Sequence, residues 1–413
     1  MEVWLGGGSC LLWEGGRRMD RMFVGVDISK DTFSAAGLDA EGNECFSGLY
    51  SMDSDGFCKF LEIVTTHGQD RQKVLVGMES SGCYHINLFS FLTTQGVQAV
   101  VINPLLIANF AKRSLRKTKT DKKDARTIAK FLRENGEEIF QLPISQDLQD
   151  LRDLARERES LSHLISATKV EIKRVLRTIF PELESIADIY TWVMLRFLQA
   201  YPSARWVKAT KLKVLAQALR QPYVGHKLTF SAEDILRAAQ SSVATASPAK
   251  EIILKGKMAT LLHLQERMEE MTKLLTDLCK ATRIEDLQIL RSIKGVGPKT
   301  GVPFLAEMGS VENFSSPKKL IAFAGMDPSV CQSGKYIGKS KLSKRGNRHL
   351  RRAIYLMTAA VVSKNAFFKA YFLRRKKEGL IPQKALLATA HKLIRVIFAM
   401  LSHRTYFQAK MAI

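Results

Sequence analysis

The chain has 413 residues, of which 46% are hydrophobic, and carries a formal net charge of +23. This length and hydrophobic content are enough for two or three domains with real cores. Six scattered cysteines without CxxC or Cys/His spacing argue against structural zinc and for reduced thiols, and no stretch of eighteen apolar residues occurs, so no membrane span is expected.

The cations are clustered, which favours a nucleic-acid partner over the alternative of a basic protein with a merely solvated surface. Residues 111–133 carry ten Lys or Arg, and the segment from Lys335 to Arg352 carries eight with no acid among them. Such blocks bind phosphate backbones and release counterions. Residues 1–21 resemble a signal peptide only weakly, because their apolar stretch is broken, so a disordered leader or an upstream start codon is expected.

Residues 22–144 are predicted to form an α/β domain. Its strands and helices follow the order strand, strand, strand, helix, strand, helix, strand, helix, which is the order of an RNase H-like (RuvC-like) sheet. The strands are expected at 23–27, 32–38, 45–50, 74–78 and 97–102, and the helices at 53–66, 84–95 and 105–133.

Four acidic residues of this domain have the spacing of a metal-dependent nuclease. Asp27 and Glu79 each end an apolar run, and Asp121 and Asp124 lie three apart, on one face of a helix. A lone strand-end Asp is usually a cap or turn residue. Four carboxylates together would repel one another without a cation, so the set predicts a Mg²⁺ site suited to phosphoryl transfer.

The middle of the chain, residues 145–283, is predicted to be helical. Apolar residues follow 3-4 spacing over 151–179 and again over 261–278, with Arg158 and Thr168 at seam positions. An antiparallel coiled coil or a dimer seam is one interpretation, and two amphipathic helices packed on a bundle is the other. The segment between them, 186–246, looks helical and basic, and no chemistry is assigned to it.

The last domain, 284–405, opens with a turn typical of a helix-hairpin-helix at Ile293–Gly297. Its glycines, Gly295 and Gly297, would let backbone N–H groups approach a phosphate beside Lys299, although Gly-rich turns between helices are common without DNA. The basic run 335–352 is either a solvated helix face or a phosphate contact; its turn-like Lys344-Arg345 favours the second. Helices at 350–362 and 383–403 are expected to finish the chain.

Six motifs in this order resemble the IS-one-ten family of insertion-sequence transposases, the bridge-RNA-guided recombinases. The resemblance covers almost all of residues 22–405. The chain departs from the family pattern in its long helical middle, where 186–246 is enlarged, and in Asp327, which stands before the proline of FAGMDP. No role is attached to Asp327. The motifs are GVDISKDTF (25–33), ESSGCY (79–84), KTDKKDA (119–125), IKGVGPKTG (293–301), FAGMDP (323–328) and QSGKYIGKSKLSKRGNRHLRR (332–352).

The resemblance implies a RuvC-like domain whose DEDD set, Asp27, Glu79, Asp121 and Asp124, binds Mg²⁺, and a C-terminal transposase domain with a nucleophilic serine, placed at Ser333. Ser340 and Ser343 are rivals in the same loop. It also implies a homo-oligomer (dimer or tetramer), a composite site formed by different subunits, a structured guide RNA and a bacterial or archaeal cytosolic, nucleoid-associated protein. The expected nucleic-acid contacts are Lys117, Lys119, Lys122, Lys123, Gly295, Gly297, Lys299, Lys335, Lys339, Lys344, Arg345 and Arg348.

Together these features predict a DNA transposase that cuts and rejoins strands through a phosphoserine, with Mg²⁺ at the DEDD set. The alternative is a RuvC-like metal-dependent nuclease acting on branched DNA, which would activate water with the same carboxylates but would not need Ser333. A second alternative is a non-catalytic DNA-binding protein, against which the complete DEDD set speaks.

Overall fold

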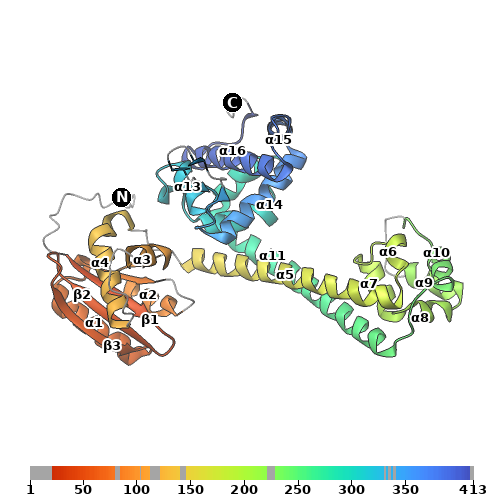
Figure 1. Ribbon diagram of the computed structural model, residues 1–413, viewed down its shortest axis with the longest axis horizontal. Coiled ribbons are helices and arrows are strands. Elements are labelled where there is room, and N and C mark those ends of the chain that lie inside the picture. The colour runs from red at the N-terminus through yellow and green to blue at the C-terminus, as the bar shows by residue number, and fades with distance from the viewer. Residues whose placement is uncertain are drawn as a thin grey trace, which may run out of the picture. The chain divides into compact units, whose positions relative to one another are not determined.

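The computed structural model describes residues 21–79, 84–102, 104–111, 121–139, 146–220, 228–329, 332–333, 336–337 and 341–409. Four predicted nucleic-acid contacts, Lys117, Lys119, Lys335 and Lys339, and most of the expected leader lie outside these residues. For Asp121, Lys122 and Ser333 only the backbone is described. The chain divides into two compact units, Met1–Pro143 and Ile144–Ile413 (Figure 1).

The first unit is built on a mixed five-stranded sheet with the strand order β3-β2-β1-β4-β5. The first three strands are antiparallel, whereas β1, β4 and β5 run parallel. This arrangement is compatible with an RNase H-like fold, and the five predicted strands are confirmed. The elements are β1 (Met22–Ile28), β2 (Thr32–Leu38), β3 (Glu44–Ser51), α1 (Ser54–Gly68), β4 (Val74–Glu79), α2 (His85–Thr94), β5 (Gln98–Ile102), α3 (Pro104–Ala111) and α4 (Asp121–Ile139).

Side chains alternate between the two faces of this sheet, and each face has its own core. Val24 and Val26 of β1 lie in the core that includes α1 and α2. Phe23, on the opposite face, packs with Ile128 and Leu132 of α4. Because residues 23, 25 and 27 share a face, Asp27 belongs to the side of the sheet that α4 covers.

The expectation of one helix over 105–133 is wrong. The structure has two helices, α3 and α4, which pack against each other on the same face of the sheet. Periodicity within a continuous run of helix-forming residues does not reveal where a chain turns back. The two apolar stripes face the same sheet, and both are buried in this way.

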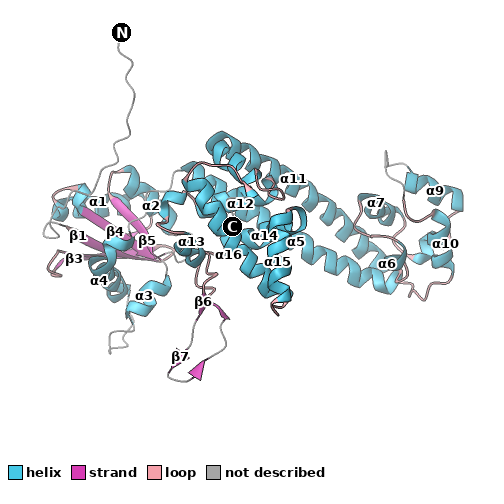
Figure 2. Cartoon of the chain, turned by 90° about the horizontal axis from the view of Figure 1, so that it is seen from above, coloured by secondary structure: helices cyan, strands magenta, loops and turns pink. Residues whose placement is uncertain are grey.

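The second unit contains two separate hydrophobic cores joined by the long helices α5 (Gln146–Ile179) and α11 (Pro248–Arg291), which run side by side (Figure 2). One core lies among the ends of these two helices and the short helices of the middle segment. The other forms the C-terminal part. The short helices are α6 (Leu183–Ile186), α7 (Trp192–Ala200), α8 (Ala204–Lys208), α9 (Leu212–Arg220) and α10 (Ala232–Gln240).

The pairing of α5 with α11 occurs within one chain. Leu161 and Leu261 are buried, and the side chain of Arg158, one of the two predicted seam residues, donates to the Thr272 hydroxyl over 2.9 Å. A supercoiled geometry and a dimer seam both remain predictions. Helix α11 is interrupted at Arg283, whose backbone leaves helical geometry close to the predicted start of the last domain.

In the described C-terminal part, helices α12 to α16 pack around one core together with ends of α5 and α11, and two pairs of two-residue strands lie in the loop before α14. By length and composition α16 is the one described helix that would suffice to cross a membrane, but its Leu393, Ile394 and Ile397 are fully buried in this core. Helix α15 was not predicted. The elements are α12 (Pro298–Met308), α13 (Pro317–Phe323), β6 (Pro328–Ser329), β7 (Gln332–Ser333), β8 (Tyr336–Ile337), β9 (Lys341–Leu342), α14 (Arg348–Lys364), α15 (Ala366–Lys377) and α16 (Pro382–Ser402).

Candidate functional site

Two of the predicted acidic residues end neighbouring parallel strands. The register pairs Val26 of β1 with Met78 of β4, and Asp27 and Glu79 come directly after this pair. Both are half-buried. Because their side chains project from the same face of the sheet as Phe23 and Leu75, they lie on the side covered by α4.

Helix α4 packs on β1 so closely that residue 25 must lack a side chain. A Cβ on Gly25 would lie 2.1 Å from the carbonyl oxygen of Ala125 and 2.3 Å from the backbone nitrogen of Ala129. Asp121 and Asp124 stand in the first turn of this helix, next to Ala125. The backbone therefore brings the first turn of α4 to the edge where β1 and β4 end.

The backbones of all four predicted ligands thus belong to one edge of the first unit, formed by the ends of β1 and β4 and the first turn of α4. We call it the acidic edge. Among the side chains that the structure describes, which exclude that of Asp121, no three acidic, histidine or cysteine side chains are gathered closely enough to form a metal site. The donor set itself contains only carboxylate oxygens, the ligands that Mg²⁺ prefers. The residues present therefore fit a hard divalent cation.

Among the described cations of the block 111–133, Arg126 and Arg133 make contacts within the fold. The Arg126 guanidinium lies 3.3 Å from the carboxylate of Glu44 on β3, and Arg133 donates to the backbone carbonyl of Glu41. These two arginines fasten α4 across the sheet.

In the second unit, Ser333 lies on β7, and its backbone pairs with that of Tyr336 on β8. A second pair of short strands, β6 and β9, joins the two sides of the loop nearer its base. Ser333 therefore stands on the loop between α13 and α14, residues 324–347, which we call the serine loop. The rival Ser340 lies outside the described residues.

The base of this loop is closed by contacts between two of the motifs. The Ser343 hydroxyl donates to the Asp327 carboxylate over 2.6 Å, and the Ser343 backbone N–H donates to the Asp327 carbonyl. Closer to the core, a Cβ on Gly346 would lie 2.3 Å from the carbonyl oxygen of Phe323 and 2.4 Å from the backbone nitrogen of Gly325. The rival Ser343 is therefore engaged in holding the loop, and so is Asp327.

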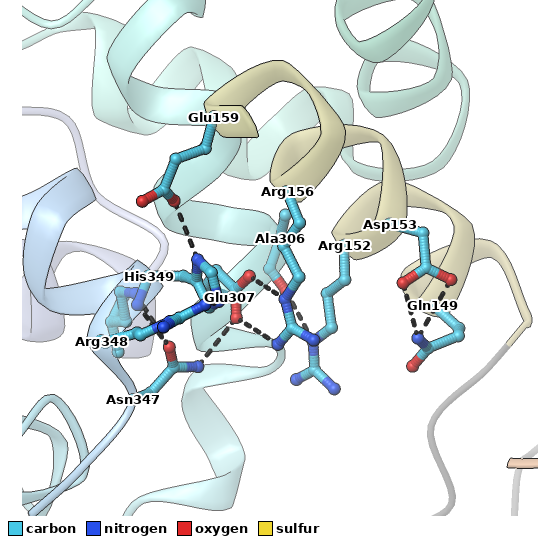
Figure 3. A network of polar contacts seen from close by, with 11 residues as sticks. Gln149, Arg152, Asp153, Arg156, Glu159, Ala306, Glu307, Asn347, Arg348 and His349 are labelled. Atoms are coloured by element: carbon cyan, nitrogen blue, oxygen red, sulfur yellow. Dashed lines mark hydrogen bonds and ion pairs between the residues drawn. The ribbon is translucent and has the colours of Figure 1, made fainter. Parts of the chain in front are cut away.

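A buried carboxylate fixes the N-terminus of α14 just beyond the loop. Asn347 caps this helix by accepting from the backbone N–H groups of His349 and Leu350, and its amide donates to Glu307 over 2.8 Å (Figure 3). Glu307, which is 2% exposed, also accepts two hydrogen bonds from Arg156 of α5, at 2.7 and 3.0 Å.

The environment of Glu307 favours its charged form. Burial raises the pKa of this carboxyl, but the hydrogen bonds and charge of Arg156, aided by the Asn347 amide, outweigh burial and hold the pKa below its usual value. Glu307 thus links α5, α12 and the start of α14 as an ionised group. It was not predicted, since no local pattern relates Arg156 to a residue 151 positions away.

A second polar contact orients the basic helix. His349 Nδ1 lies 2.8 Å from a carboxylate oxygen of Glu159 on α5, and Arg352 approaches the other oxygen at 3.5 Å (Figure 3 shows the histidine contact). The predicted contacts Lys344, Arg345 and Arg348 remain exposed. The basic run is therefore divided, with some cations held against α5 and others turned to solvent.

The predicted helix-hairpin-helix turn separates α11 from α12. Gly295 has φ +109°, and a Cβ there would lie 2.8 Å from the Ala360 carbonyl and from the Val361 Cα in α14. A glycine is therefore required at position 295 by the close approach of α14 and by the positive φ. Gly297, at the N-terminus of α12, would have space for a Cβ, its backbone N–H donates to the Thr300 hydroxyl, and Lys299 is exposed. A phosphate contact at this turn stays a prediction.

Two family models match the chain at these two sites. Residues 24–181, which carry the acidic edge, match a transposase model of the DEDD type of IS110. Residues 287–373, which carry the loop and the basic helix, match the model described as transposase IS116/IS110/IS902 family. The chain belongs to the IS110 family of transposases. It is an enzyme, a transposase or DNA recombinase.

Relatives of this IS110-family transposase match along almost the whole chain. It is 27% identical to the "insertion element IS116 uncharacterized 44.8 kDa protein" of Streptomyces clavuligerus, over 94% of this chain and 97% of the relative. It is 21% identical to the pilin gene-inverting protein of Moraxella bovis, over 95% and 99%. Identity to the transposase for insertion sequence element IS1111A of Coxiella burnetii is 23%, over 94% and 92%.

The transposase contains two acidic residues, Asp327 and Glu307, that hold the fold around the predicted serine and that the sequence interpretation missed. Asp327 was given no role, yet it closes the serine loop, and Glu307 was not considered. A signal for Asp327 was present, because it lies within a motif, FAGMDP, that carries the family resemblance. Glu307 had no such signal: it is an ordinary acidic residue near the end of a helix.

Proposed function

We propose that this IS110-family transposase cuts and rejoins DNA strands with a divalent metal ion, Mg²⁺, held by Asp27, Glu79, Asp121 and Asp124, and with Ser333 as nucleophile. A structured RNA guides it to its DNA sites, and it acts as a homo-oligomer in the cytosol. DNA is the substrate class that the family implies. The guide and the oligomer rest on the family resemblance, and the net charge of +23 is compatible with both nucleic acids.

The single observation that carries the proposal is the meeting of β1, β4 and the first turn of α4 at one edge. Asp27 and Glu79 follow a paired position of two parallel strands, and Gly25 admits the helix that carries Asp121 and Asp124. A bound divalent ion there would neutralise charge on the reacting phosphate. The four carboxylates would hold it, and their common edge supports that role.

The assignment of the nucleophile to Ser333 rests on the family resemblance, and the described base of the serine loop is compatible with it. The Asp327–Ser343 contact closes this base and gives Ser343 a role in holding the loop. In the proposed step the Ser333 oxygen forms a bond to phosphorus while a bond from phosphorus to a deoxyribose oxygen breaks. The serine proton is released, and the departing oxygen takes up a proton. Exposed Lys344, Arg345 and Arg348 would attract the phosphate.

The experiment is a search for a covalent adduct. Labelled donor DNA is incubated with protein, the RNA of the element and Mg²⁺, then denatured and resolved. We expect labelled wild-type protein, with mass spectrometry locating the phosphate on Ser333. Ser333→Ala should lose cleavage and rejoining but keep DNA binding, since one hydroxyl adds little to an interface dominated by charge. Ser340→Ala is the matched control and should keep the adduct.

Other outcomes discriminate between mechanisms. An adduct on Ser340 or Ser343 would preserve the phosphoserine mechanism and refute the assignment of Ser333. Cleaved DNA with free ends and no labelled protein would show that water is the nucleophile, and the nuclease interpretation would then replace this one.

A further inference from the structure

Helix α15 exposes a cationic face outside both predicted basic blocks. Its sequence, AFFKAYFLRRKK, ends in four consecutive cations and contains no acid. Apart from Ala366 at its start, the residues that this helix exposes, and that we call the α15 face, are Lys369, Ala370, Leu373, Arg374, Lys376 and Lys377. They recur at intervals of three and four along the helix and therefore share one side of it.

The opposite side of α15 is firmly anchored. Asn365 caps the helix, Phe368 is fully buried, and its ring stacks on that of Phe407. The ammonium group of Lys392 lies over the rings of Phe367 and Tyr371. These contacts determine which side of the helix is free to meet a partner.

The charge on this face is largely uncompensated. Glu378, just beyond the helix, lies near Arg374 and Arg375. Within the described part of the chain, Lys369, Lys376 and Lys377 make no ion pair. Burial, with the charge of Arg374 adding to it, lowers the pKa of Lys392. One or two cations would suffice to balance the partial negative charge at the C-terminal end of α15. The remaining positive charge of the α15 face is therefore available to an anion.

The form of the face matches a phosphate backbone. From Lys369 to Lys377 the helix rises about 12 Å, which corresponds to roughly three phosphates of one strand along a duplex. Ala370, Leu373, Arg374, Lys376 and Lys377 line a shallow hollow of about 600 Å³. Leu373, 45% exposed, offers an apolar contact for sugar carbons between the charges.

Two features favour a duplex over unpaired bases. Recognition of single strands uses open aromatic rings on which bases stack. On α15 the Tyr371 ring has Arg374 and Lys392 near it, and Lys376 lies over the Phe372 ring. Lysines act as point charges and carry no sequence code, which suits a backbone contact.

We propose that the α15 face binds the phosphate backbone of the duplex DNA on which the enzyme acts, as a contact separate from the 335–352 run. The inference rests on the proposed function in taking DNA as the substrate, and it adds a positioning surface on an element with no predicted role. Its contribution is independent of sequence.

The test compares two double variants of equal charge change in the full-length protein. Lys376→Gln/Lys377→Gln removes two cations of the face. Lys59→Gln/Lys173→Gln removes two lysines that each already pair with an acid, Asp55 and Glu184 respectively. Binding to a labelled DNA duplex is measured by fluorescence anisotropy over a salt series. The log–log slope should fall by one to two units for the first variant, at about 0.9 per phosphate, and stay unchanged for the second.

A third variant and an RNA arm make the result decisive. Leu373→Glu places an acid in the face and should weaken DNA binding at low salt, with unchanged circular dichroism showing that the helix persists. An equal fall in slope for both double variants, or a loss confined to an RNA duplex, would overturn the proposal. Recombination and adduct formation by the wild type are followed in parallel, so that failure of this surface is distinguished from failure of the proposed function.

Discussion

The acidic edge of the first unit and the serine loop of the second are positioned by different means. At the acidic edge, strand register and one close helix contact place the residues, so main-chain geometry decides. At the serine loop, the base is held by side chains that reach across the unit, from Asp327 to Ser343 and from Glu307 to Asn347 and Arg156. The positions of the residues at the first site are therefore determined largely by local sequence, and those at the second site much less so.

The largest effect is expected at the acidic edge, on activity. Asp27→Ala, Glu79→Ala, Asp121→Ala and Asp124→Ala should each abolish recombination in a plasmid assay, on the order of a 10³-fold loss or more, because charge neutralisation at the phosphate is lost. Chelation of divalent ions should stop the wild type as well. Thermal unfolding should show that these variants remain folded, and full activity of Glu79→Ala or Asp124→Ala would remove the metal site from the mechanism.

The role of main-chain packing at this edge is tested by stability. Gly25→Ala should destabilise the protein by about 3 kcal/mol, since the new Cβ meets backbone atoms of α4 that cannot move independently. Gly256→Ala in α11, where a Cβ meets nothing within 4 Å, is the matched control. It should stabilise by roughly 0.5–1 kcal/mol, because alanine is the better helix former. Equal effects in urea unfolding would show that α4 does not depend on Gly25.

The polar anchoring of the second unit predicts a pH-dependent effect. Glu307→Gln should cost about 1–3 kcal/mol at pH 7, because it weakens the bonds to Arg156 and Asn347 in a buried position. The pKa of Glu307 is lower in the folded protein than its ordinary value of 4.5. Its contribution is therefore present above pH 4.5 and is lost as the pH falls through the folded pKa. Urea titrations at pH 7 and at acidic pH should show the difference between wild type and variant shrinking, and a constant difference would contradict the charged state of Glu307.

The smallest effect is expected from the exposed cations beside the serine loop. Lys344→Ala/Arg345→Ala should lower the log–log salt slope of duplex binding by up to about two units, at roughly 0.9 per phosphate. Folding should be unaffected, because both side chains are exposed. If the slope measured over the salt series does not change, this part of the basic run faces solvent in the complex.

Much of the first unit was predictable from sequence. Apolar runs such as 74–78 are long enough for a buried strand and too short for most helices, and an acid at the end of such a run stands out. The place where α3 gives way to α4 was not predictable, because both helices bury apolar stripes of the same period. That the first turn of α4 lies near the end of β1 was expected only from the combined pattern, and the close packing at Gly25 that brings it there required the structure.

Less of the second unit could be predicted from the sequence. Helix α15 lacks a clear amphipathic pattern in its sequence, because Ala370 and Leu373 lie among the cations of one side and Arg375 lies among the aromatic residues of the other, and so it was not predicted. Asp327 and Glu307 acquire their roles from partners 16 and 40 residues away, Ser343 and Asn347. Such contacts depend on how α12, α13 and α14 pack, which no local pattern specifies.

The paired helices α5 and α11 set the distance between the two hydrophobic cores of the second unit. Between Ala155, which belongs to the C-terminal core, and Ile172, which belongs to the middle core, α5 rises about 25 Å, the length of roughly seven base pairs of duplex. The Arg158–Thr272 contact braces this span. One residue inserted into α5 would lengthen the span by about 1.5 Å and turn one core against the other by about 100°. The distance between the two cores and their relative rotation about α5 therefore cannot be changed independently by an insertion in this helix.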